Sequence, residues 1–118
     1  MSLETTRVEI DASQWADLEE ALSALARALR FPDYFGGNLD ALVDCLRDVV
    51  DGDDRIGLPS RALAVDVRGY SRFAARSAGP ASRLEATVAD VSSEAAADGF
   101  TLTWNLDGRA PVTGGGAP

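Results

Sequence analysis

The sequence predicts an α/β domain in which a small three-stranded parallel sheet is packed by about four helices. The prediction comes from three segments of alternating apolar side chains, residues 5–10, 61–67 and 100–106, with stretches of helical periodicity between them. Strands that alternate with helices form parallel sheets with right-handed crossovers. The length of 118 residues suits one domain with a single modest core.

The first strand and the first helix are expected within residues 5–29. Val8 and Ile10 share one face of the strand. Either Asp11 or Ser13 is expected to cap the helix, because a short polar side chain can accept hydrogen bonds from the first amides. The apolar residues of this helix repeat at intervals of three and four and are Trp15, Leu18, Leu22, Leu25 and Leu29.

A loop and a second helix follow over residues 31–50. Pro32 ends the first helix, because proline lacks the amide hydrogen and restricts the residue before it. Gly36 and Gly37 make the loop conformationally permissive. Asn38 is well placed to cap the second helix. The apolar stripe of this helix is formed by Leu39, Leu42, Val43, Leu46, Val49 and Val50.

The rest of the chain completes the α/β pattern. Its elements are a turn-rich loop at 51–59, a strand at 61–67, a helix at 70–78 anchored by Phe73, a helix from Pro80 to about Ala97, and a strand at 100–106. The domain is therefore predicted to span residues 1–106. Residues 107–118 are rich in Gly, Pro and Ala, have nothing to bury, and are expected to form a disordered tail.

Composition and charge exclude several classes of function. Nineteen acidic residues against eleven basic ones give a net charge of −8, which disfavours binding to nucleic acid or to an anionic membrane. No signal peptide and no membrane-spanning apolar stretch is recognisable, and the single cysteine, Cys45, permits no internal disulfide. Cys45 is interpreted as a packing residue. These features predict a cytoplasmic protein.

Catalysis is not expected. The sequence has no histidine, the usual acid–base residue, and no nucleophile elbow or cluster of metal ligands. Gly36, Gly37 and Asn38 precede a helix as in a phosphate cradle, but Asp33 and Asp40 would repel a phosphate and no P-loop lysine follows. We therefore predict that the protein is not an enzyme and binds no cofactor or metal.

Three aspartates form a row on the second helix. Asp40, Asp44 and Asp48 lie four residues apart, on the flank of the apolar stripe. Like charges at this spacing cost about 0.2–0.5 kcal/mol per pair, and only Asp40 lies in the first turn, where the helix dipole favours it. The row is either a solvated helix face or a negative surface for a positively charged partner. The helix pattern by itself favours the solvated face.

The run FPDYFGGNLDALVDCLRDV at residues 31–49 resembles the signature of the barstar family, bacterial intracellular inhibitors of a secreted guanyl-preferring ribonuclease. The family pattern contains a proline, an acid, two aromatics, a glycine, Asn-Leu-Asp-Ala-Leu and then Asp-Cys-Leu. The positions that fit it are Pro32, Asp33, Tyr34, Phe35, Gly36, Asn38 through Leu42, Asp44, Cys45 and Leu46. The resemblance implies the same fold, a three-stranded parallel sheet with four helices.

The resemblance also implies roles for five of these residues. A ribonuclease active site holds phosphodiester oxygens with cationic side chains, and carboxylates on a rigid helix can occupy the same positions. By resemblance, Asp44 is the most deeply inserted acid and Asp40 lies beside it. Tyr34 lies over the enzyme's catalytic histidine, and Gly36 and Asn38 shape the loop that enters the cleft. Alternatively, Tyr34 is a loop aromatic folded onto its own core and Asn38 is a simple helix cap; Asn38 can also do both.

Three further positions complete the candidate surface. Glu94 matches a partner-binding glutamate of the family and lies in a second acidic row with Asp90 and Asp98, which alternatively is an exposed face. Val43 stands where the family prototype carries tryptophan. Arg47 follows Asp44 by three residues, so it can pair with Asp44 within the helix or meet an acid on a different enzyme.

We therefore expect a protein that is monomeric when free and forms a one-to-one complex with a basic, extracellular-type ribonuclease, blocking its active site. The expected partner-binding residues are Tyr34, Gly36, Asn38, Asp40, Val43, Asp44, Arg47 and Glu94. The alternative, favoured by Val43 and Arg47, is a barstar-fold interaction module whose partner is not a ribonuclease.

Overall fold

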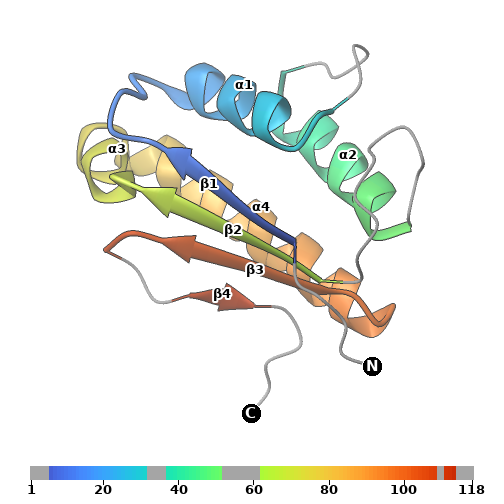
Figure 1. Ribbon diagram of the computed structural model, residues 1–118. Helices are drawn as coiled ribbons and strands as arrows, with labels where there is room; N and C mark the ends of the chain where they lie inside the picture. The colour runs from blue at the N-terminus through green and yellow to red at the C-terminus, as the bar shows by residue number, and fades with distance from the viewer. Residues whose placement is uncertain (1–5, 32–36, 52–61, 109–110, 114–118) are drawn as a thin grey trace.

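The computed structural model of this chain describes residues 6–31, 37–51, 62–108 and 111–113. Three parallel strands lie side by side in chain order: β1 (Thr6–Asp11), β2 (Ala62–Arg68) and β3 (Thr101–Leu106) (Figure 1). The four helices are α1 (Leu18–Ala28), α2 (Leu39–Asp51), α3 (Tyr70–Arg76) and α4 (Ala78–Ala97). The predicted α/β class, with three parallel strands and four helices, is confirmed.

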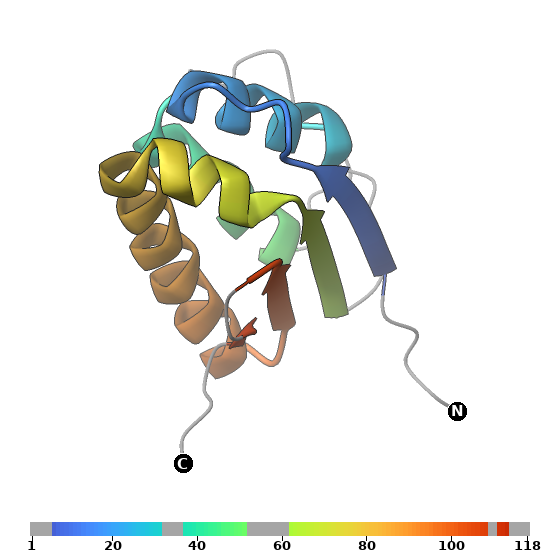
Figure 2. The ribbon, with the colours of Figure 1, turned by 90° about the vertical axis from the view of Figure 1, so that its left-hand side faces the viewer.

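The helices gather on one side of the sheet (Figure 2). Alternation along the strands explains this arrangement, because the apolar residues of each strand share one face. Val65 on β2 and Trp104 on β3 are neighbours in register and are both buried on this face. The stripe of α2 is directed at the same core, where Leu42 and Leu46 are fully buried. The sheet thus provides one rigid surface on which α2 and α4 are positioned.

The core also contains polar groups, and these are paired. Trp104 Nε1 donates a hydrogen bond of 3.1 Å to Ser92 Oγ on α4, which ties this helix to β3. Phe73 anchors α3 as predicted, and its ring meets Trp15 and Tyr70 edge-on at centroid distances of 5.4 and 5.7 Å. Within the described residues, no buried side-chain nitrogen or oxygen lacks a hydrogen-bond partner. The core therefore carries no uncompensated polar group there.

The prediction that Asp11 or Ser13 caps the first helix is wrong. The cap is Asp17, whose side chain accepts a hydrogen bond of 2.9 Å from the Glu20 amide, while Glu20 accepts one of 3.0 Å from the Ala16 amide. This arrangement is similar to a capping box, except that Glu20 reaches the amide of the residue before the cap. Asp11 instead accepts the Ser13 amide at 2.9 Å in the turn that follows β1. Trp15 is buried as predicted, but it lies in the connection before α1.

Asp17→Ala is expected to lower the free energy of unfolding by about 1 kcal/mol, because a first-turn amide of α1 loses its acceptor. Urea unfolding followed by circular dichroism would measure the loss. The matched control is Asp90→Ala, an exposed aspartate inside α4, which should change stability by less than about 0.5 kcal/mol. Equal losses in the two variants would contradict the capping role.

A fourth strand extends the sheet beyond the predicted three. Val112–Thr113 (β4) pairs antiparallel with β3, Val112 opposite Trp104 and Thr113 opposite Thr103. The predicted disorder of residues 107–118 is therefore wrong for these two residues. Their pairing uses main-chain groups at the open edge of β3, so the Gly/Pro/Ala-rich composition of the segment gave no sign of it. Val112 also packs against the core.

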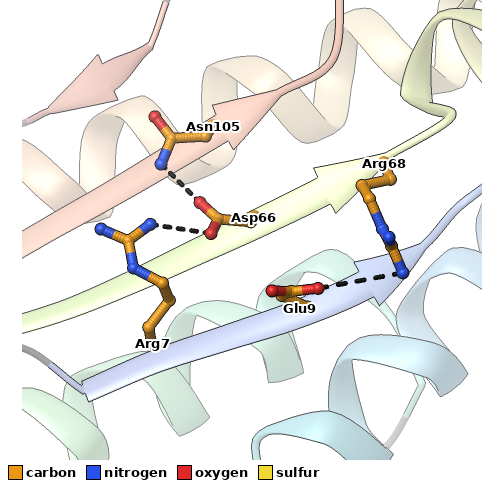
Figure 3. Close-up of polar contacts among 5 residues, drawn as sticks. All are labelled: Arg7, Glu9, Asp66, Arg68 and Asn105. Carbon is orange, nitrogen blue, oxygen red and sulfur yellow. Dashed lines mark hydrogen bonds and ion pairs between the residues drawn. The ribbon is translucent and has the colours of Figure 1, made fainter.

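The face of the sheet opposite the helices is polar. Asp66 on the central β2 accepts hydrogen bonds from Arg7 at 2.7 Å and from Asn105 at 2.6 Å, which links β1, β2 and β3 (Figure 3). Arg68 lies 3.8 Å from Glu9 in a second, looser pair. Parallel sheets usually have both faces covered. Here the cross-strand pairs satisfy the polar groups of a face that no helix of the described chain covers.

The Asp66 network predicts a pH dependence of stability. Hydrogen bonds from Asn105 and then Arg7 lower the pKa of Asp66 below its usual value of 3.8. A carboxylate with a lowered folded-state pKa stabilises the fold above the unfolded-state pKa, and this stabilisation disappears as the pH falls through the folded-state pKa. Wild type should therefore lose its stability advantage over Asp66→Asn as the pH falls below about 4. Urea unfolding at pH 7 and at pH 3 would measure this, and a pH-independent difference would contradict it.

Candidate partner-binding site

The site begins at the N-terminus of α2, where Asn38 caps the helix as predicted. Its Oδ1 accepts a hydrogen bond of 2.8 Å from the Ala41 amide, and its carbonyl accepts one of 3.0 Å from Leu42. Gly37, immediately before it, has a φ of +72°, a conformation that favours glycine. Tyr34 and Gly36 lie outside the described residues. The cap fixes the start of the helix that carries the acidic row.

Asp40 and Asp44 lie one turn apart on the exposed side of α2. Both side chains are exposed, and within the described parts of the chain neither makes a hydrogen bond or an ion pair. Asp48, the third member of the row, is half-buried and is engaged in an interaction within the chain. Two of the three carboxylates are thus available to another molecule.

Arg47 contacts Glu94 on α4. Its Nε donates to Glu94 Oε1 at 2.8 Å and its Nη2 to Oε2 at 3.0 Å, so one edge of the guanidinium engages both carboxylate oxygens in a bidentate ion pair. The pair that the sequence allowed between Arg47 and Asp44 within α2 is not the one observed. No spacing in the sequence indicates the observed pair, because its two residues are far apart in the chain.

The pairing shifts the ionisation of both groups. The hydrogen bonds from Arg47 lower the pKa of Glu94. The hydrogen bonds to Glu94 and its negative charge raise the pKa of Arg47, and Asp44 adds a smaller effect through its charge alone. At neutral pH the charges of Arg47 and Glu94 cancel, so the negative charge on the α4 side comes from Asp90 and Asp98, whereas that on the α2 side comes from Asp40 and Asp44.

A small cavity of about 190 Å³ lies beside this ion pair, between α2 and α4. Its lining residues are Arg47, Val50, Val91, Glu94, Ala95 and Asp98. Val43, on α2 next to Asp44, is half-buried and packs against the core. The surface between the two acidic rows is therefore shaped by Arg47, by the acids Glu94 and Asp98 and by small aliphatic side chains, with no aromatic residue among those named.

Cys45 does not contribute a nucleophile to this surface. Its side chain is buried, and burial raises the pKa of its thiol, with further increases from the charges of Asp48 and Asp44. The predicted packing role is thus confirmed. In the described ranges, no group of three or more histidine, cysteine, aspartate or glutamate residues could hold a metal ion. Nor does any described helix combine the length and apolar character required to cross a membrane.

Comparison with known proteins decides the family. The family model described as barstar (barnase inhibitor) matches residues 5–107. The chain belongs to the barstar family. Among curated proteins, the one named "Putative ribonuclease inhibitor YrdF" from Bacillus subtilis (strain 168) is 44% identical over 45 residues. This match covers 38% of the present chain and 50% of that protein, so the two share about half of the relative's length.

Membership of the barstar family confirms two predictions made from the sequence. The resemblance of residues 31–49 to the family signature extends to a match over nearly the whole described domain. The family is one of inhibitors and not of enzymes, which agrees with the prediction that this protein is not an enzyme.

Proposed function

We propose that this barstar-family protein inhibits a basic ribonuclease by placing Asp40 and Asp44 where the enzyme holds phosphate oxygens of RNA. The proposal rests on one observation: both carboxylates are exposed, and neither has a hydrogen-bond or ion-pair partner within the described residues. No hydrogen bond or ion pair with the described residues must break before a cation of the enzyme can bind them.

Geometry and charge support this role. Side chains four residues apart on a helix have Cβ atoms about 5–6 Å apart, so one cationic cleft can contact both carboxylates. The cap by Asn38 and the buried stripe of α2 hold the row on a rigid element, which limits the entropy lost on binding. The net charge of −8 favours a rapid encounter with a basic enzyme.

The family description and the relative's name support a ribonuclease as the target. By the resemblance, Tyr34 and Gly36 belong to the loop that enters the cleft, and Asn38 contributes to it while capping α2. We propose a one-to-one complex, formed in the cytoplasm by a protein that is monomeric when free.

Titration of the cognate ribonuclease with this protein tests the proposal. RNA cleavage should stop at one equivalent, and calorimetry should give a stoichiometry of one. Full ribonuclease activity in the presence of a large molar excess of the protein would contradict it. A small, basic, secreted protein encoded by a neighbouring reading frame is the enzyme to test first.

The alternative is an interaction module of the barstar fold with a partner that is not a ribonuclease. Two observations favour it: Val43 is half-buried in place of a protruding aromatic, and Glu94 is already paired with Arg47. Affinity capture from the source cells would select this alternative if it returned a defined partner without nuclease activity, and if Asp44→Ala abolished that capture.

A further inference from the structure

The Arg47–Glu94 pair changes what the α4 side of the site can bind. Both oxygens of Glu94 already accept hydrogen bonds from the guanidinium, at 2.8 and 3.0 Å. The same guanidinium has five N–H donors, and within the described residues the Nη1 group makes no hydrogen bond. Here the surface offers the free N–H donors of Arg47 in an ion pair without net charge, whereas Asp40 and Asp44 offer acceptors and negative charge.

This pair is accessible to another molecule. Both side chains are 52% exposed, and the cavity of about 190 Å³ lies beside them. Opening the pair would not give a cation free access to Glu94, because Arg47 is attached to the adjacent helix and stays near. A lysine or arginine placed here by a partner would therefore have to compete with Arg47 for the oxygens of Glu94 while lying close to the guanidinium, which is an unfavourable arrangement in an interface.

We infer that Arg47 is a specificity-determining residue that closes Glu94 to cationic side chains. The cognate ribonuclease is then one that presents an uncharged hydrogen-bond acceptor, such as a carbonyl oxygen, opposite the cavity between α2 and α4, because Asp98 also lines this cavity and would repel a carboxylate. Cation binding is left to Asp40 and Asp44. Discrimination by such a repulsive element is a general means of rejecting the wrong partner. The inference rests on the proposed function, because it concerns which ribonuclease the site accepts.

Barnase, the enzyme named in the family description, is a suitable probe. Arg47→Ala should bind barnase about tenfold more tightly than wild type, because the repelling charge is lost and Glu94 becomes available. Arg47→Lys keeps the charge and should stay near the wild-type affinity. Arg83→Ala, an exposed arginine elsewhere on α4, changes the net charge equally and should also stay near wild type.

Dissociation constants from surface plasmon resonance would compare the four proteins, with thermal unfolding as a check that all are folded. An exposed ion pair contributes little to stability, so the variants should melt close to wild type. If Arg47→Ala binds no more tightly than wild type, or if Arg83→Ala gains as much, Arg47 does not determine specificity. Failure of wild type and Arg47→Ala alike to bind barnase would also overturn the inference. None of these results refutes the proposed function, which depends on inhibition of the cognate enzyme and on Asp44.

Discussion

Asp44→Ala is expected to weaken binding to the cognate ribonuclease by about 2–5 kcal/mol, roughly thirtyfold to several thousandfold. The loss is large because the cations that hold phosphate oxygens in the enzyme would remain buried in the interface without a counter-charge. The fold should not suffer, because the Asp44 side chain is exposed and forms no hydrogen bond or ion pair with the described residues. Alanine is also the better helix former.

The matched control for this variant is Glu9→Ala, which removes the same charge from the outer face of the sheet. Calorimetry should show nearly unchanged affinity for this control, and thermal unfolding should show a melting temperature for Asp44→Ala close to that of wild type. Asp44→Asn tests the contribution of the charge alone, because the amide side chain has nearly the same size and shape as the carboxylate but is neutral. Wild-type affinity in Asp44→Ala would eliminate the phosphate-mimic role.

Trp104→Ala is expected to lower the free energy of unfolding by about 3–5 kcal/mol. The indole is 1% exposed and lies between β3 and α4, where its Nε1 donates to Ser92. The substitution removes the apolar contacts and also leaves the buried Ser92 hydroxyl without its donor. Since domains are stable by only about 5–15 kcal/mol, this is a large share of the total.

Urea unfolding would measure the effect through a lower midpoint. Thr101→Ala, at an exposed position of the same strand, is the control and should remain within about 0.5 kcal/mol of wild type. Trp104→Phe should fall between wild type and alanine, because an aromatic ring is kept and the hydrogen bond is lost. A midpoint unchanged in Trp104→Ala would show that the indole is not the link between β3 and α4 that the structure indicates.

Local chemistry explains which elements were predicted correctly and which were not. Strand alternation and helical periodicity predicted the three long strands and the four helices. The Asn38 cap could also be predicted, because it depends only on the position of Asn38 before an apolar stripe. The start of α1 was misplaced because Asp11 and Ser13 have side chains suited to capping, as Asp17 does. Asp11 accepts a hydrogen bond in the turn after β1, and the signal overlooked was an aspartate, Asp17, followed three residues later by Glu20.

Other features could not be predicted from local sequence. β4 has only two residues, Val112–Thr113, and depends on the open edge of β3 and not on its own propensity. The ion pair of Glu94 could not be predicted either. The acidic row on α4 gave no indication that an arginine of another helix binds both carboxylate oxygens of Glu94.

The sequence by itself determined the order of strands and helices and the exposure of Asp40 and Asp44, because both follow from periodicities of 2 and 3.6 residues along one element. Only the tertiary structure decided that Arg47 binds Glu94 and forms no ion pair with Asp44. The physical reason is that a bidentate pair requires a carboxylate held in the plane of the guanidinium edge. Packing of α2 against α4 over the shared core supplies that position, which Asp44 on the same helix does not.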